Sequence, residues 1–179
     1  MSSIYASALR PLMFFLPPEA AHDLAKVSLR SGFPWSRTGA GRIEGIERLK
    51  CRAGRLELAS PIGLAAGFDK NAEALPGLDQ LGFGYLTVGS IMPVPRPGNP
   101  KPRLLRLPDR ESLLNCYGLP SDGLEACAKR LELFARRGRR SQLIANIDSP
   151  DVDIYLKSFL RVEPFVDAIE IGTQCPNNT

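Results

Sequence analysis

Six polar residues follow apolar stretches of strand length or lie in the long loop between two of them. They are Asp69, Lys70, Asn115, Asn146, Cys175 and Asn177. The carboxyl ends of parallel strands meet at one edge of a sheet, so residues that follow different strands converge there. A lysine at such an edge supplies charge for an anion, amides hydrogen-bond a planar heterocycle, and a thiol can act as a base or nucleophile. The set predicts an anion-binding catalytic site.

Simpler interpretations of the single residues remain open. Lys70 at a strand end can extend into solvent. Cys175 can be a buried thiol without a role, and His22 can be an ordinary helix residue. Cys116 and Cys127 are expected to serve packing.

The stretch PIGLAAGFDKN, residues 61–71, is expected to position the lysine. Residues 62–66 have the small and apolar composition of a buried strand, and Gly63 and Gly67 allow a second backbone or a flat ligand to come close. Burial of a cation directly after a strand costs free energy unless an anion pairs with it. Lys70 is therefore expected at a ligand site.

Strand and helix patterns alternate after residue 60. We expect strands over residues 62–66, 85–89, 143–147 and 166–171. We expect helices over residues 72–81 and 122–137, and a third that begins with Ser149 as N-cap and Pro150 at its first position. The apolar stripe expected on the second helix is Leu124, Cys127, Ala128, Leu131 and Phe134, and on the third it is Val152, Tyr155, Leu156, Phe159 and Leu160.

This alternation predicts an α/β fold with a parallel sheet. Four such units are half of a (β/α)8 TIM barrel, which takes about 250 residues. We therefore expect residues 49–179 to be the first half of a barrel in a longer protein, with an open sheet as the alternative. A hairpin over 49–52 and 55–58 precedes the first strand, and residues 91–121 are expected to be a long loop rich in proline and glycine.

Residues 1–35 are expected to form a separate helical unit, followed by a linker over 36–48. Leu12–Leu16 is a dense apolar run, and residues 19–30 form a short helix with Leu24 and Val27 on one face. Exposed apolar side chains beside a few cations suit a segment that lies in a membrane interface. The alternative is a pair of helices packed on the main domain.

The composition excludes several classes of function. The chain has 179 residues, 44% of them apolar and 23% charged, with a net charge of +4, which is too mild to indicate nucleic acid. The basic residues 136–140 are explained by the end of a helix. Four cysteines without a C-x-x-C pair and the single histidine, His22, give no metal-ligand spacing, and the scattered cysteines suggest reduced thiols in the cytosol.

Four strings in the sequence resemble dihydroorotate dehydrogenase. They are PIGLAAGFDKN, GFGYLTVGS, PRPGNPKPRLLRLP and LLNCYG. The N-terminal RPLMFFLPPEAAHDLAKVSLR resembles the extension of the membrane-associated, quinone-dependent (class 2) members. The resemblance implies an eight-stranded barrel with FMN at its carboxyl face.

The resemblance also implies roles for individual residues. Contact with FMN is implied for Ala66, Gly67, Phe68, Asp69, Lys70, Ser90 and Asn146. Contact with the substrate is implied for Lys70, Asn115, Cys116, Tyr117, Gly118, Leu119 and Asn177. Cys175 stands at the catalytic base, which takes a proton from C5 of dihydroorotate while hydride leaves C6, and His22 and Arg106 lie toward the quinone.

The implied function is oxidation of dihydroorotate to orotate in pyrimidine biosynthesis, with a membrane quinone as acceptor. The implied location is peripheral, on the cytoplasmic face of the inner cell membrane. No metal and no nucleic acid are expected.

The chain departs from the family pattern around the expected site. Cys116 replaces an arginine and Leu119 a phenylalanine, Asp148 and Ser149 replace a Gly-Lys pair, and Gly172 replaces an asparagine. These departures leave two alternatives, an inactive half-barrel fragment or a related flavin enzyme with another cyclic substrate.

Overall fold

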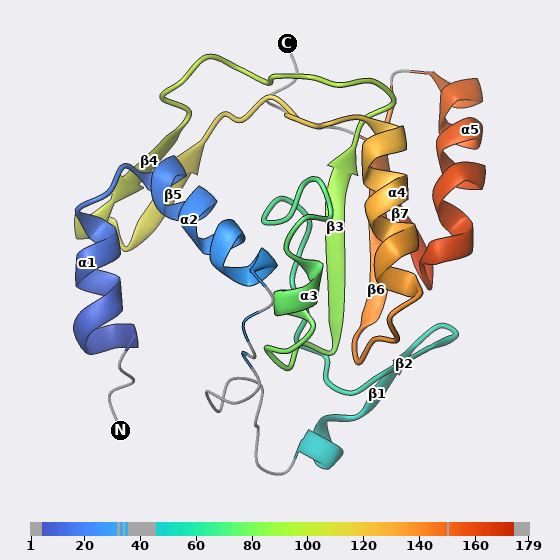
Figure 1. The fold of residues 1–179 in the computed structure, drawn as a ribbon, viewed down its shortest axis with the longest axis horizontal. Coiled ribbons are helices and arrows are strands. Elements are labelled where there is room, and N and C mark those ends of the chain that lie inside the picture. Colours follow the sequence, from blue (N-terminus) through green and yellow to red (C-terminus); the bar gives the residue numbers. More distant parts are fainter. Residues whose placement is uncertain (1–4, 32, 34, 36–45, 150, 174–179) are drawn as a thin grey trace.

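A three-stranded parallel sheet lies at the centre of the molecule, in a computed structural model that describes residues 5–31, 33, 35, 46–149 and 151–173. The strand order is β3 (Tyr85–Ile91), β6 (Gln142–Asp148) and β7 (Ala168–Gly172). Helices α4 (Leu124–Ala135) and α5 (Val152–Val162) lie side by side along the sheet (Figure 1). The predicted α/β character and three of the four predicted strands are confirmed.

The core lies between the sheet and α4. Alternate residues of the strands point to it, among them Leu86 and Val88 of β3 and Leu143 of β6. They meet Cys127, Ala128, Leu131 and Phe134 of α4, which are all buried. The stripe predicted for this helix is thus confirmed, with Leu124 at its partly buried end.

The strand predicted over residues 62–66 is wrong as a regular strand. Only Leu64 forms a bridge, to Leu86 of β3. The amide of Leu64 donates to the Tyr85 carbonyl at 3.0 Å, and the Thr87 amide donates to the Leu64 carbonyl at 2.8 Å. The segment therefore runs parallel to β3, and the Gly67 amide also donates to the Gly89 carbonyl at 2.9 Å, but the pairing is regular only at Leu64.

The helix predicted over residues 72–81 is also wrong in extent. The observed helix, α3, covers only Leu75–Leu78. Ala72 has a left-handed φ of 57°, which the start of a helix cannot use, and Pro76 and Gly77 favour a short turn.

Helix α5 begins later and buries another face than predicted. Asp151, not Ser149, caps it, and its carboxylate accepts from the amides of Asp153 and Ile154 at 2.8 and 3.3 Å. The predicted first position, Pro150, lies outside the described residues. Residues Ser158 and Val162 are buried.

Much of the stripe predicted for α5 is exposed. The exposed members are Val152, Leu156, Phe159 and Leu160, and Val152 is 82% exposed. Elements α4 and β6 cover the other side of the helix, so this face has no cover within the described residues.

A second hairpin interrupts residues 91–121, which were predicted to be a loop. It pairs β4 (Leu104–Leu107) with β5 (Ser112–Asn115), joined by a 3-10 turn at Pro108–Arg110. The predicted first hairpin is confirmed in shorter form as β1 (Cys51–Ala53) and β2 (Leu56–Leu58), after a 3-10 turn at Ile46–Leu49. A last 3-10 turn, Glu163–Phe165, joins α5 to β7.

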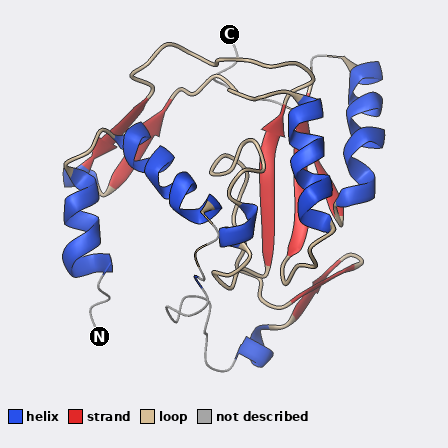
Figure 2. Ribbon diagram, viewed as in Figure 1, coloured by secondary structure: helices blue, strands red, loops and turns tan. Residues whose placement is uncertain are grey.

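The N-terminal helices lie beside the second hairpin, away from the central sheet (Figure 2). They are a π-helical turn at Tyr5–Leu9, α1 (Arg10–Phe14) and α2 (Pro18–Arg30). Arg106 of β4 donates to the carbonyls of Met13, Phe14 and Leu16 at 3.3, 3.3 and 2.8 Å, which ties the end of α1 to the hairpin.

Helix α2 packs closely on α3. A Cβ on Gly77 would lie 2.4 Å from the Leu29 carbonyl oxygen, so only glycine allows this approach. Lys26 and Arg30 also pair with Glu73 at 3.4 and 3.1 Å. None of the helices in the described part of the chain has the length and apolar content needed to cross a membrane.

Candidate active site

Lys70 lies in the loop where the chain leaves the edge of β3. Its ammonium donates to the Gly67 carbonyl and lies 4.2 Å from the centroid of the Tyr117 ring. No carboxylate of the described residues pairs with it within 4.0 Å. Burial, followed by the charges of Lys26 and Arg103, lowers the pKa of Lys70 to about 8. The residue is thus a partly buried cation without a counter-ion, which suits an anionic ligand.

Asp69 turns away from Lys70 and holds the loop in place. It is fully buried, and its carboxylate accepts from the amides of Glu73 and Ala74 at 2.9 and 2.8 Å. Burial raises its pKa in spite of these two hydrogen bonds. The carboxylate therefore supports the loop and lines none of the cavities described below.

Lys70 lines a cavity of about 380 Å³. The residues with expected FMN or substrate contacts that line it are Ala66, Gly67, Lys70, Ser90, Asn115, Tyr117, Gly118 and Leu119. They come from the loop after residue 66, the end of β3 and the end of β5. We name this space the polar cavity, because Lys70, Asn115 and Ser90 are among its lining residues.

Lys70 also lines a larger cavity of about 760 Å³, between the N-terminal helices and the second hairpin. Most of its lining is apolar, with Met13, Leu24 and Leu113 among the contributors. His22 and Arg106, the residues expected near a quinone, both line it, as does Phe68. We name this space the apolar cavity.

His22 is held by the loop that carries Lys70. Its Nε2 lies 2.8 Å from the Phe68 carbonyl oxygen, which only accepts, so we assign the ring hydrogen to Nε2. Burial lowers the pKa of His22, and Lys70 and Lys26 lower it further. The neutral ring then keeps Nδ1 as an acceptor.

The two cavities share a wall. Five residues line both: Gly67, Lys70, Leu104, Leu113 and Tyr117. Lys70 and Tyr117 are the polar members of this shared wall.

The side-chain oxygen of Asn146 on β6 has no hydrogen-bond partner among the described residues. The residue is 5% exposed, and its Nδ2 donates to Glu170 on β7 at 2.8 Å, while its Oδ1 is buried without a partner. Glu170 lies directly opposite Asn146 in the register of β6 and β7. Sequence reasoning missed Glu170, although alternation along the strand puts it on the same face as Gly172.

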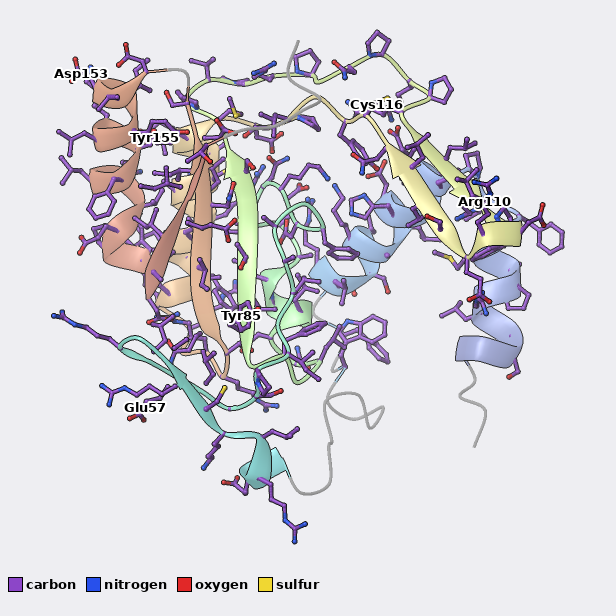
Figure 3. The ribbon with its side chains drawn as sticks, turned by 180° about the vertical axis from the view of Figure 1, so that it is seen from behind. Glu57, Tyr85, Arg110, Cys116, Asp153 and Tyr155 are labelled. Carbon is purple, nitrogen blue, oxygen red and sulfur yellow. The ribbon has the colours of Figure 1, made fainter. Side chains whose placement is uncertain are left out.

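Asp148 and Gly172, two departures from the family pattern, fit together in space. They are paired across β6 and β7, and a Cβ on residue 172 would lie 3.0 Å from Asp148 Oδ2. The Tyr155 hydroxyl contacts the Gly172 carbonyl and lies 3.3 Å from Asp148 Oδ1, between α5 and the strand ends (Figure 3). The carboxylate thus stands where a side chain at position 172 would begin.

The remaining expected site residues lie elsewhere. Cys116 is exposed at the end of β5 and lines neither cavity (Figure 3), so its predicted packing role is wrong, whereas Cys127 is buried as predicted. Cys116 uses its backbone, whose amide donates to the Arg103 carbonyl at 2.9 Å. Cys175 and Asn177 lie outside the described residues.

Comparisons with known proteins agree with this arrangement. A family model described as dihydroorotate dehydrogenase matches residues 48–179. A dihydroorotate dehydrogenase (quinone) of Anaeromyxobacter dehalogenans strain 2CP-1 is 40% identical over 177 residues, 95% of this chain and 48% of that protein. One of Roseiflexus sp. strain RS-1 is 39% identical over 188 residues, 99% of this chain and 51% of that protein.

A solved structure is similar as well. The crystal structure of DHODH from Eimeria tenella in complex with ferulenol has a TM-score of 0.81 and 34% identity, over 90% of this chain and 45% of that one. The chain spans about half the length of these relatives. Because the family model covers most of the sequence, the chain belongs to the dihydroorotate dehydrogenase family, and the named relatives are of the quinone-dependent kind.

Proposed function

We propose that this chain is the amino-terminal half of a (β/α)8 barrel that oxidises dihydroorotate to orotate in pyrimidine biosynthesis, with FMN as cofactor and a membrane quinone as acceptor. The observation that carries the proposal is the shared wall, which brings a lysine without a carboxylate partner among the described residues to the boundary of a polar and an apolar cavity. The relatives named dihydroorotate dehydrogenase (quinone) support the same assignment.

The polar cavity is proposed to take the substrate. Lys70 pairs with its carboxylate, since it has no counter-ion among the described residues and burial makes an ion pair favourable there. Asn115, with the backbone of Gly118 and the side chain of Leu119, bounds the ring. Cys175 removes the proton from C5 and Asn177 hydrogen-bonds the ring.

The residues of this chain fit a flavin. The buried Asn146 Oδ1 lacks a donor, which a flavin ring N–H would supply, and the side-chain position of Gly67 faces open space. Ala66, Gly67, Ser90 and Asn146 are proposed to hold FMN, and Asp69 keeps their loop in shape through Glu73 and Ala74. When bound there, FMN supplies a hydride acceptor.

The apolar cavity is proposed to take the quinone. Its apolar lining suits the ring and tail of a quinone. Arg106 supplies donors for a ring oxygen, and the free Nδ1 of His22 accepts from the hydroxyl of the reduced quinol. Phe68 and His22 are 5.0 Å apart between ring centroids, and they link this cavity to the loop of Lys70.

Residues 1–35 are proposed to hold the protein at the cytoplasmic face of the inner cell membrane, before a linker over 36–48 and the half-barrel over 49–179. Large apolar side chains on α1 and α2 are exposed, with Leu12 63% and Val27 64% exposed. Deletion of residues 1–35 is expected to move the protein from the membrane fraction to the supernatant. No redistribution would contradict a membrane role for this segment.

A second candidate function is a related flavin enzyme that acts on another cyclic substrate. The observation that favours it is the Asp148 carboxylate beside Gly172, which offers only acceptors where the family has an asparagine amide. Saturable oxidation of dihydroorotate would contradict this candidate.

The test of the main proposal is the flavin. Protein produced from the whole gene is expected to be yellow and to release FMN on denaturation. A colourless protein that releases no FMN would contradict the proposal. The gene beyond Thr179 tests the inactive-fragment alternative, because an in-frame continuation with four more βα units supports the enzyme and a stop codon supports the fragment.

A further inference from the structure

Two cations lie against the ring of Tyr117. The Lys70 ammonium is 4.2 Å and the Arg103 guanidinium carbon is 5.0 Å from the ring centroid. Burial raises the pKa of the Tyr117 hydroxyl, so the residue offers its ring and not a phenolate to these cations at neutral pH. The contact of Lys70 with Tyr117 is therefore one between a cation and an aromatic ring.

Arg103, the second cation at this ring, is fixed by further contacts. Its guanidinium donates to the carbonyls of Pro97 and Asn99 at 2.7 and 3.2 Å, and its Nε lies 3.3 Å from Glu19 of α2. The Arg103 and Glu19 side chains are only 11% and 14% exposed. The surroundings of the Tyr117 ring are therefore tied to α2 and to the loop before β4.

The charged groups around Lys70 do not explain why it remains in place. Lys26 of α2 and Arg103 repel its charge, and burial disfavours it. Asp69 and Glu19 attract it, but neither pairs with it within 4.0 Å, and the Asp69 carboxylate is used by two amides. His22, from α2, is neutral. The Tyr117 ring and the Gly67 carbonyl are the remaining partners within the described residues.

We propose that Tyr117 is a positioning residue for Lys70. The Tyr117 ring holds the Lys70 ammonium charged and in place at the shared wall. This role deepens the proposed function, on which it rests for its meaning in catalysis. This role differs from a contact between Tyr117 and the substrate, because the Tyr117 ring acts on Lys70 when no ligand is present.

The test replaces Tyr117 with phenylalanine and with fluorinated phenylalanines, whose aromatic rings have decreasing electron density. Tyr117→Phe keeps the ring, and its mono-, di- and trifluorinated forms weaken cation binding with little change in shape. The pKa of Lys70 is read in the full chain by NMR of isotope-labelled lysine side chains, with Lys70→Arg identifying the signal. We expect the pKa to fall stepwise, by about 0.5 to 1.5 in total.

Tyr85 provides the matched control. Tyr85 is the first residue of β3, at the end of the strand away from Ser90 (Figure 3). It packs over Gly63 and contacts no cation among the described residues. The same fluorinated series at position 85 is expected to leave the Lys70 titration unchanged. An equal Lys70 pKa across the series at position 117 would overturn the proposal, and so would equal shifts from positions 117 and 85.

A second readout links the ring to function. The pH above which orotate binding weakens is expected to fall in parallel with the Lys70 pKa, and an unchanged binding profile would overturn the role. Because the NMR titration needs neither flavin nor substrate, its failure would contradict the role of Tyr117 alone. A protein without flavin would contradict the proposed function alone.

Discussion

The polar and apolar cavities differ in size, lining and charge, although they share five residues. The apolar cavity has twice the volume, about 760 Å³ against 380 Å³, and is built largely by the N-terminal helices and the second hairpin. The polar cavity is built by the loop after residue 66, the end of β3, the second hairpin and the loop after β5. Burial leaves His22 neutral on the apolar side, whereas Lys70 stays charged below a pH of about 8 on the shared wall.

This difference indicates a division of labour. Under the proposed function, the Lys70 charge pairs with the carboxylate of the substrate, and the uncharged quinone is bound mainly through contact with apolar side chains. Loss of the Lys70 charge is therefore expected to affect oxidation of the substrate, and loss of Arg106, which lines the apolar cavity alone, is expected to affect reduction of the quinone.

The largest effect is expected from Lys70→Ala. Loss of a buried, charge-assisted contact should slow reduction of the flavin by dihydroorotate about 100-fold or more, because such a contact contributes about 3 kcal/mol. Stopped-flow absorbance of the flavin measures this step, and quinone-driven reoxidation should change little. Lys129→Ala, on the exposed side of α4, is the control. Unchanged reduction in Lys70→Ala would remove Lys70 from the site.

The pH dependence of orotate binding is expected to show the next effect. Lys70 loses its proton as the pH rises through its pKa of about 8, and the neutral amine cannot form an ion pair with a carboxylate. Affinity should be level below pH 8 and fall about tenfold for each pH unit above it. Spectral titration of the bound flavin with orotate measures it. Lys70→Arg should bind with a flat profile, since arginine stays charged; a fall near pH 8 in this variant would point to another group.

Arg106→Ala breaks the apolar cavity. It removes the donors to the carbonyls of Met13, Phe14 and Leu16 and the cation over the Phe14 ring. We expect the KM for quinone to rise about tenfold, the effect of losing about 1.4 kcal/mol, while flavin reduction is kept. Arg110→Ala, exposed at the tip of the hairpin (Figure 3), is the control. Slower flavin reduction in Arg106→Ala would contradict the separation of the cavities.

The smallest effect concerns the attachment of α2. Glu19→Gln leaves Arg103 partly buried with a neutral partner, and we expect the free energy of unfolding to fall by about 1–2 kcal/mol. Glu47→Gln, which removes an exposed pair with Lys50, should lower the free energy of unfolding much less. Urea unfolding followed by circular dichroism compares them. Equal losses would show that Glu19 does not hold α2.

The sequence predicted those parts of the fold that local pattern controls. The stripe of α4 follows the helical period and contacts the sheet along its length, so Cys127 and Leu131 are buried as expected. Residues 62–66 have strand composition, but their pairing depends on a neighbour and on two glycines, and composition does not report either. The exposed stripe of α5 has the same cause, because the period gives the face and not what covers it.

The site was predictable where residues of one loop carry it. Lys70 could be expected at a ligand site from a charge placed after an apolar run. Other parts of the site join segments that are far apart in the chain or lie on neighbouring strands. They are the contact of Lys70 with Tyr117, the contacts of Arg106 with the α1 carbonyls and the fit of Asp148 to Gly172. Their distances arise only on folding, and no spacing in the sequence reports them.

The most direct test of the division between the cavities is an anaerobic experiment in two steps. Dihydroorotate is mixed with the flavin-loaded protein, a quinone is added after the flavin colour is lost, and the return of the colour is followed. We predict that Lys70→Ala slows only the loss of colour and that Arg106→Ala slows only its return. Equal slowing of both steps by either variant would contradict the account.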